Sequence, residues 1–248
     1  MSTETYLKIN KTSVLLHNWL KMQASKESLT WLEDKQTEIK RNAKEKTLFI
    51  AFSKASRYLE EQKLELSTKE LQAADDIITG WNPINWTVDQ VGRTWLILAF
   101  PHEDRHKYVA TLDKIFAAAD VKEAIALYQS LPLLPHPEEF KLRAAEGIRS
   151  NMTSVFNAVA LYNPYPAQYL NDLAWNQMVL KALFIGSSLH PIYGLEQRNN
   201  EQLSQMLIDY ARERLAAKRK VNPQLWQLAA SFKPQAVASL EAAFKSVV

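Results

Sequence analysis

The chain has 248 residues, of which 30 are basic and 27 acidic, so its net charge is only +3. This small excess argues against a nucleic-acid-binding surface, and the absence of cysteine excludes disulfides, thiolate metal sites and cysteine nucleophiles. The first residues lack a basic segment followed by an apolar one, and the longest apolar run, Trp95–Phe100, is far shorter than the roughly 20 residues of a membrane span. We therefore expect a cytoplasmic protein.

The composition predicts an all-α protein. Glycine occurs only 5 times, helix-forming residues are abundant, and no run alternates apolar and polar residues as a strand does. Thr87 with Gln90, and Asp120 with Glu123, form capping-box patterns that mark two helix starts. In chain order we expect helices over residues 4–22, 26–44, 46–59, 67–78, 87–98, 104–118, 121–130, 138–159, 167–184, 201–219, 223–232 and 235–246.

The connections between these helices are short. Pro132, Pro135 and Pro137 predict a stiff connector. Ser150–Asn151 is a candidate break within helix 138–159, because Asn and Ser side chains compete for backbone groups. Short connections favour antiparallel neighbours, so two architectures fit: antiparallel helix pairs stacked as a HEAT-like right-handed solenoid, or a compact multi-helix bundle.

The chain divides by motif content into two parts. Residues 1–82 form an N-terminal helical part without a recognised motif, and residues 83–248 form the second part. No linker rich in Pro, Ser or Gly separates them. We therefore expect one continuous structural unit.

Helix 167–184 is apolar nearly all round, which is typical of a helix buried on most sides. On a helical wheel one side holds Tyr169, Leu173, Leu180, Leu183 and Phe184, and the other holds Trp175, Met178 and Ala182. The helix nevertheless carries Asn176, Gln177 and Lys181, and burial of an unpaired amide costs on the order of 2–7 kcal/mol. These groups are therefore either paired inside the protein or face a polar cavity.

Further polar side chains lie beside expected core positions. Arg149 and Asn151 flank the apolar stripe of the preceding helix, Arg214 falls within the stripe of helix 201–219, and His190 lies in the loop after residue 184. An inward arginine needs an anion, either a protein carboxylate or a ligand. The candidate ligand-binding set comprises eight residues: Arg149, Asn151, Tyr165, Asn176, Gln177, Lys181, His190 and Arg214.

Each candidate also has a purely structural interpretation. Asn151 caps a helix and the Arg149 stem covers apolar surface in that view. Lys181 either has a lowered pKa and acts as a base, or pairs with a carboxylate such as Glu146 or Asp172. The structural interpretation is favoured for all of them.

Residues 102–106 match the zinc-binding pattern H-E-x-x-H, in which two histidines share a helix face. Pro101 places His102 at the very start of a helix, and the two x positions are Asp and Arg. We therefore interpret this stretch as an exposed helix start and expect no metal site.

Several motifs in the second part stand out together. They are Leu131-Pro132-Leu133-Leu134-Pro135, Glu146-Gly147-x-Arg149-x-Asn151-Met152, Val155-Phe156, Asn163-Pro164-Tyr165-Pro166, the run Ala174–Phe184, and Asp209-Tyr210-Ala211-x-Glu213-Arg214. Over about residues 87–230 this pattern resembles the EboA family of metabolite traffic proteins. The resemblance would make residues 83–248 an EboA-like helical domain.

The resemblance implies a role beside other products of a bacterial gene cluster, the ebo cluster. These include a UbiA-type prenyltransferase, a TatD-type hydrolase and a sugar-phosphate-cyclase-like enzyme. It implies movement of a secondary-metabolite precursor from the cytoplasm to the periplasm. Cluster proteins, including the membrane prenyltransferase, would be partners and would hold the chain at the inner membrane. The resemblance supplies no catalytic residue and no cofactor.

Three functions follow as hypotheses. The first is a non-enzymatic protein that binds a small metabolite or a partner protein, because no nucleophile–base constellation or Gly-rich phosphate loop is visible. In this first hypothesis, the amides of the candidate set orient the ligand, and the cations of the set bind a carboxylate, phosphate or phenolate. The second is a cofactor-independent lyase or isomerase that uses Lys181 or His190 as base. The third is a scaffold whose stacked helices dock cluster proteins.

Overall fold

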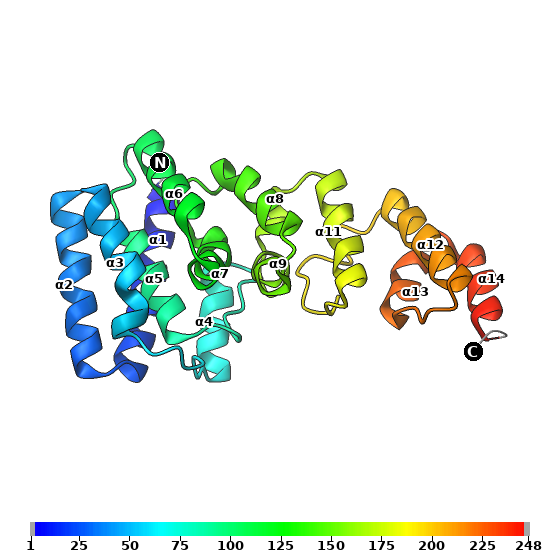
Figure 1. Cartoon of the computed structure of the whole chain (residues 1–248), viewed down its shortest axis with the longest axis horizontal. Helices are drawn as coiled ribbons and strands as arrows, with labels where there is room; N and C mark the ends of the chain where they lie inside the picture. The colour runs from blue at the N-terminus through cyan, green and yellow to red at the C-terminus, as the bar shows by residue number, and fades with distance from the viewer. Residues whose placement is uncertain (1–2, 246–248) are drawn as a thin grey trace. The chain divides into compact units, whose positions relative to one another are not determined.

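The computed structural model of the chain describes residues 3–245, which form fourteen α-helices and two short 3-10 helices, η1 and η2 (Figure 1). The all-α class is confirmed, and the helices pack on one another as a multi-helix bundle. No helix within these residues has the length and apolar composition needed to cross a bilayer. Residue 246, the last of the expected C-terminal helix, lies outside the described residues. The elements are α1 (Thr3–Gln23), α2 (Lys26–Asn42), α3 (Glu45–Tyr58), α4 (Thr68–Ile77), α5 (Val88–Ala99), α6 (Arg105–Ala118), α7 (Val121–Ser130), η1 (Leu131–Leu133), η2 (Pro137–Phe140), α8 (Lys141–Arg149), α9 (Thr153–Ala160), α10 (Tyr165–Tyr169), α11 (Asp172–Ile185), α12 (Glu201–Ala216), α13 (Pro223–Ala230) and α14 (Pro234–Lys245).

Side chains at the helix ends explain where most helices begin. The side chain of Gln90 accepts a hydrogen bond from the Thr87 N–H (3.0 Å), as the capping-box pattern predicts. Asp120 and Glu123 satisfy each other's backbone N–H groups in the same way at the start of α7. These interactions satisfy backbone donors that a helix cannot pair internally.

The predicted helix 167–184 is wrong in its boundary. The chain forms the short α10, breaks at Leu170, and starts α11 with Asn171 as N-cap, whose Oδ1 accepts from the Ala174 N–H (2.9 Å). Leu173 and Phe184 of α11, expected inside, are 54% and 78% exposed. Trp175, Met178 and Ala182 are fully buried, and they form the inner side of α11.

The expected break in helix 138–159 is present. The segment consists of η2, α8 and α9, and α8 ends where Ser150 Oγ accepts from the Met152 N–H (3.1 Å). Where α8 passes α7 and α9, a Cβ at Gly147 would lie 2.6 Å from Val159 Cγ2 and 2.8 Å from Tyr128 Cε1. Only glycine allows these three helices to approach so closely.

The contacts divide the chain into two compact units, one ending at Tyr165 and the other beginning at Pro166. In the first unit, α1, α2 and α3 all pack against α5, so residues before and after position 82 share one core. The expected distinction between residues 1–82 and 83–248 concerns motif content, and it stays a prediction.

A buried arginine connects three helices of the first unit. Arg93 on α5 is 1% exposed, and its Nη1 donates to the Phe52 carbonyl of α3 (2.8 Å) and lies 3.3 Å from Glu123 Oε1 of α7. Its Nε lies 3.6 Å from Asp89 Oδ2, one turn earlier on α5, and the guanidinium stacks over the Phe52 ring. One guanidinium thus holds two buried carboxylates, and the relative positions of α3, α5 and α7 are fixed by it.

The H-E-x-x-H stretch, residues 102–106, was expected to be exposed, but His102 is buried. Helix α6 begins at Arg105, so His102 lies before the helix and shares no helix face with His106. The His102 ring is buried against the Tyr108 ring, whereas His106 is exposed. Within residues 3–245 no group of three or more His, Cys, Asp or Glu side chains is placed to hold a metal ion.

We predict that Arg93→Met destabilises the protein by about 3–5 kcal/mol, because Asp89 and Glu123 are left buried without a counter-charge. Urea unfolding monitored by circular dichroism measures the change. The matched control is Lys122→Met, which removes the exposed ion pair with Glu61 and should lower stability far less. Equal effects of the two variants would contradict the role assigned to Arg93.

We also predict a loss of stability at alkaline pH that depends on Tyr108. Burial raises the pKa of its hydroxyl, which donates to the Ile97 carbonyl (3.3 Å), above the ordinary value of about 10. The stabilisation is complete below that pH and is lost as the pH rises, because only the unfolded chain ionises there. In urea titrations at about pH 8 and pH 11, Tyr108→Phe should lose less stability between the two values than the wild type. Tyr6→Phe, at an exposed position, should lose as much as the wild type.

Candidate functional site

The candidate residues of the first unit do not face a common cavity. Arg149 at the end of α8 and Asn151 in the following turn are exposed. Tyr165 is fully buried, and its hydroxyl donates to the Pro137 carbonyl (2.5 Å). Tyr165 therefore holds η2 in place, and its hydroxyl is already bonded within the protein.

The amides of α11 fall into two environments. Asn176 is fully buried and exchanges two hydrogen bonds with Asn200, at 3.1 Å and 2.9 Å. Asn200 Oδ1 also accepts from the Leu203 N–H (2.8 Å) and caps α12. Gln177, one residue along α11, is exposed. A polar group in this helix was expected either to be paired inside the protein or to face a polar cavity. Asn176 is paired inside the protein.

The two candidate cations of the second unit are Lys181 on α11 and Arg214 on α12. Partial burial lowers the pKa of Lys181, but the carboxylates proposed for it, Glu146 and Asp172, are bound to arginines. Among the described residues, Arg214 pairs with a backbone carbonyl and not with a carboxylate: its Nε and Nη2 both donate to the Lys220 carbonyl, at 2.9 Å and 2.7 Å. The Lys220 carbonyl accepts both donors, as a carboxylate would. Arg214 therefore stabilises the turn that follows α12.

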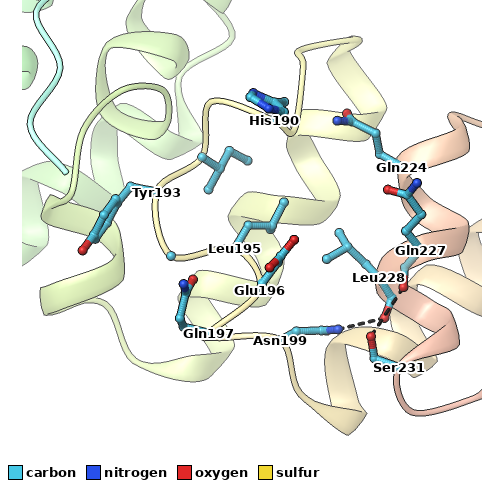
Figure 2. Close-up of a pocket in the computed structure, with 12 residues that line it drawn as sticks. His190, Tyr193, Leu195, Glu196, Gln197, Asn199, Gln224, Gln227, Leu228 and Ser231 are labelled. Atoms are coloured by element: carbon cyan, nitrogen blue, oxygen red, sulfur yellow. Dashed lines mark hydrogen bonds between the residues drawn. The ribbon is translucent and has the colours of Figure 1, made fainter.

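His190 is the candidate residue that lies at a cavity. This cavity, of about 560 Å³, belongs to the second unit and lies between the loop over residues 186–200 and helix α13 (Figure 2). The loop contributes His190, Ile192, Tyr193, Gly194, Leu195, Glu196, Gln197 and Asn199, and α13 with its C-cap contributes Gln224, Gln227, Leu228 and Ser231. In Figure 2, the amides of Gln224 and Gln227 lie on the α13 side, and Leu195 and Glu196 lie opposite Leu228.

Arg198 holds one end of this loop. Its Nη1 donates to the carbonyls of Pro166, Ala167 and Leu170, at 3.2, 3.2 and 2.8 Å, where α10 ends. Its Nη2 binds Asp172 Oδ1 at 2.5 Å. The guanidinium also lies 4.9 Å from the centre of the Trp175 ring. A single side chain thus fixes the loop against α10 and α11.

Two amides fix the loop against α13. Gln224 Oε1 accepts from the Leu189 N–H (3.2 Å), and Asn199 Nδ2 donates to the Leu228 carbonyl (2.8 Å). Between these points Gly194 has a positive φ of 77°, and a Cβ there would lie 2.9 Å from the Ala167 Cβ. The loop is therefore held against α13 by side-chain bonds, and glycine at position 194 lets it approach Ala167 closely.

The lining determines which ligands fit. Among its twelve described residues none is Lys or Arg, Glu196 is the one carboxylate, and four are amides. Asn199 Oδ1 is buried and has no hydrogen-bond partner within the described residues. Ile192, Leu195 and Leu228 add apolar surface. The cavity therefore suits a neutral molecule with hydroxyl or N–H groups and an apolar part.

Sequence reasoning identified one lining residue, His190, and missed Arg198, Asn199, Gln224 and Gln227. Each is a common polar residue without a motif, and Arg198, Asn199 and Gln224 bind partners 28 to 35 positions away. The density of polar side chains in the loop over residues 186–200 was the available indication.

Comparison with family models gives one match, to the metabolite traffic protein EboA, over residues 12–230. The chain belongs to the EboA family. The EboA match includes the motifs over residues 87–230, and it extends into the N-terminal helices from residue 12. It also includes every residue of the cavity except Ser231. The comparisons with curated proteins and with solved structures found no match.

The structure gives a physical role to one EboA motif, the turn Asn163-Pro164-Tyr165-Pro166. Asn163 Nδ2 donates to the carbonyls of Tyr128 (3.1 Å) and Ala158 (3.0 Å), and its Oδ1 accepts from the Tyr165 N–H (3.0 Å). All these bonds are internal, so the motif serves the fold. The ligand-binding role of the eight candidate residues stays a prediction.

We predict that Arg198→Met destabilises the second unit by about 2–3 kcal/mol, because the carbonyls of Ala167 and Leu170 and the Asp172 carboxylate lose this donor. Hydrogen exchange of the loop amides measures the effect directly: the Arg198 N–H, which donates to the Gly194 carbonyl, should lose protection. The control is Arg212→Met, an exposed arginine paired with Asp209, which should change stability by about 0.5 kcal/mol or less. Unchanged exchange in Arg198→Met would contradict the anchoring role.

Proposed function

We propose that this EboA-family protein takes part in metabolite traffic by binding a small metabolite in the cavity between the loop over residues 186–200 and α13. The family description supports the traffic role, and the cavity supports binding as the molecular act. The observation that supports this proposal is the composition of the cavity lining. Amides, hydroxyls and three apolar side chains surround about 560 Å³, and Asn199 Oδ1 is buried beside it without a hydrogen-bond partner.

The size of the cavity fits a ligand of ordinary metabolite dimensions. Small-molecule sites typically enclose about 300–1,000 Å³. Four amides, which both donate and accept, can fix the orientation of a neutral ligand, while Ile192, Leu195 and Leu228 remove its apolar part from water.

This proposal changes the ligand class expected from the sequence. Carboxylate, phosphate or phenolate ligands were expected because Arg149, Lys181 and Arg214 were assigned to the groove. None of these cations lines the cavity, and Glu196 would repel an anion. We therefore propose a neutral metabolite, or one with a single positive charge beside Glu196.

Transfer to partners is a further part of the proposal. The protein would receive the metabolite in the cytoplasm and pass it to proteins of its gene cluster, including the membrane prenyltransferase, at the inner membrane. The resemblance to the family supports these partners and this location.

We predict that native mass spectrometry of the protein, purified gently from cells of its own source, detects a bound species of discrete mass. Gln227→Trp should lose this species, because Gln227 is an exposed cavity residue and an indole there fills the space. The matched control is Gln202→Trp, at an exposed glutamine of α12 that does not line the cavity, and it should retain the species.

Thermal unfolding of both variants checks that they remain folded, since surface substitutions change stability by about 0.5 kcal/mol or less. Loss of the species from both variants, or its retention in Gln227→Trp, would overturn the assignment of this cavity. A wild-type protein that carries no bound species would overturn the binding proposal.

A further inference from the structure

The net charge of the chain is concentrated in the second unit. Residues 166–248 contain nine Lys and Arg and six Asp and Glu, whereas residues 1–165 contain 21 of each, so the second unit carries the whole net charge of +3. Five of its nine basic residues lie within residues 212–220. A helix dipole favours cations only within the last turn, and Lys218, Arg219 and Lys220 lie beyond the end of α12. Their number therefore has no explanation in the stability of that helix.

The turn that follows α12 has a fixed backbone and exposed basic side chains. The Arg219 N–H donates to the Arg214 carbonyl (2.8 Å), and the Lys218 N–H donates to the Leu215 carbonyl (2.9 Å). The Arg214 guanidinium holds the Lys220 carbonyl. Lys218, Arg219 and Lys220 are exposed, and among residues 3–245 none of the three belongs to an ion pair. Their charges are therefore available to an external anion.

The outer face of α11 is apolar although the protein does not cover it. Leu173 and Phe184 are 54% and 78% exposed, and Leu180 between them is half-buried. Leu173 and Phe184 are 11 residues apart, which is about three helical turns, so they lie on one line along the helix. An exposed apolar stripe of this kind indicates a contact surface.

The end of α11 lies beside the basic turn. The Tyr210 hydroxyl of α12 reaches the carbonyl of Leu183, the residue before Phe184 (3.5 Å). Arg214, one turn further along α12, lies 5.9 Å from the centre of the Tyr210 ring and binds the Lys220 carbonyl. Consecutive contacts thus connect the end of α11 to the turn. We call the surface formed by Phe184, Lys218, Arg219 and Lys220 the basic end.

We propose that the basic end binds the surface of an anionic lipid bilayer. The charges are complementary, because negatively charged headgroups attract Lys and Arg side chains close to the surface. The Phe184 ring and the Leu173 side chain enter the boundary between headgroups and acyl chains, which removes their apolar surface from water.

Two other occupants match this surface less well. Protein–protein interfaces are depleted of Lys, whereas two of the three basic residues of the turn are Lys. Nucleic acid binds Lys and Arg through its phosphates, and it would leave the apolar stripe of α11 in water.

This inference goes beyond the function proposed above, in which partner proteins hold the chain at the membrane. None of the twelve described residues that line the 560 Å³ cavity belongs to the basic end. Purified lipid vesicles contain neither partner proteins nor a metabolite. Failure to bind them would leave the cavity proposal standing, and an empty cavity would leave the lipid proposal standing.

The experiment measures co-sedimentation of the full-length protein with lipid vesicles of two compositions. One kind is pure phosphatidylcholine, and the other contains about one third phosphatidylglycerol, which is anionic; binding to the second should be about tenfold stronger or more. Raising NaCl from about 0.1 M to about 0.5 M should weaken this binding, because salt screens the attraction.

Charge variants test the turn. Each cation near an anionic surface contributes about fivefold to binding, so replacement of all three should weaken it about a hundredfold; this variant is Lys218→Gln, Arg219→Gln and Lys220→Gln. The matched control replaces two Lys and one Arg that are also exposed, at the end of α2: Lys40→Gln, Arg41→Gln and Lys44→Gln. The control loses the same charge and should bind nearly as the wild type does. Circular dichroism checks that both variants are folded.

A fluorescent label tests insertion of the apolar side chain. The chain has no cysteine, so Phe184→Cys gives a single site for an environment-sensitive dye. Its emission should shift to the blue when anionic vesicles are added, because the dye leaves water. The matched control is Leu142→Cys on α8, a position that is equally exposed at 78%, and its emission should not change.

The proposal is overturned if the protein does not bind anionic vesicles, if it binds both kinds of vesicle equally, or if the two charge variants bind equally. It is also overturned if the dye at position 184 does not respond to vesicles. A blue-shifted dye without lipid would mean that a second copy of the chain covers Phe184, and displacement from vesicles by duplex DNA at equal phosphate concentration would identify a nucleic-acid site. Selective loss in the variant of the turn, together with the blue shift at position 184, supports the proposal.

Discussion

The geometry of the second unit depends on the Arg198 guanidinium. Helix α10 is only five residues long, so most of its carbonyls lack partners within the helix. Arg198 donates to the carbonyls of Pro166 and Ala167 in α10 and of Leu170 just after it. It also binds Asp172 at the start of α11 and covers Trp175. These bonds hold the loop that carries Arg198 in place, and this loop forms one wall of the 560 Å³ cavity. The Arg198 guanidinium therefore both pairs backbone carbonyls near α10 and positions the loop that lines the cavity.

The all-α class, most helix positions and both capping boxes could be predicted from the sequence, because composition, periodicity and capping are local properties. The boundary at Leu170 could not, since Asn171 as N-cap competes with a continuous apolar pattern over residues 167–184. The candidate site was harder still. A buried amide such as Asn176 indicates a partner without naming it, and here the partner is Asn200, 24 residues away. Arg93 and Arg198 gave no local indication, because their roles come entirely from distant carbonyls and carboxylates.

The cavity of the second unit is lined mainly by uncharged groups. The chain is 23% charged, yet this cavity has no cation among its described lining residues. Charged side chains instead hold helices together, as Arg93 does, and anchor the loop, as Arg198 does. Amide-lined cavities select by the pattern of donors and acceptors, and they discriminate strongly against ligands that leave an amide unpaired. Long-range electrostatic attraction contributes little to such sites, so binding should depend weakly on salt.

The close packing at Gly147 has a mechanical consequence. Its missing side chain lets α8 rest on Val159 and on the Tyr128 ring. The Tyr128 carbonyl in turn accepts the Asn163 amide, which shapes the turn where the first unit ends. Adding one methyl group at Gly147 would therefore displace Tyr128 and, through its carbonyl, the turn at Asn163.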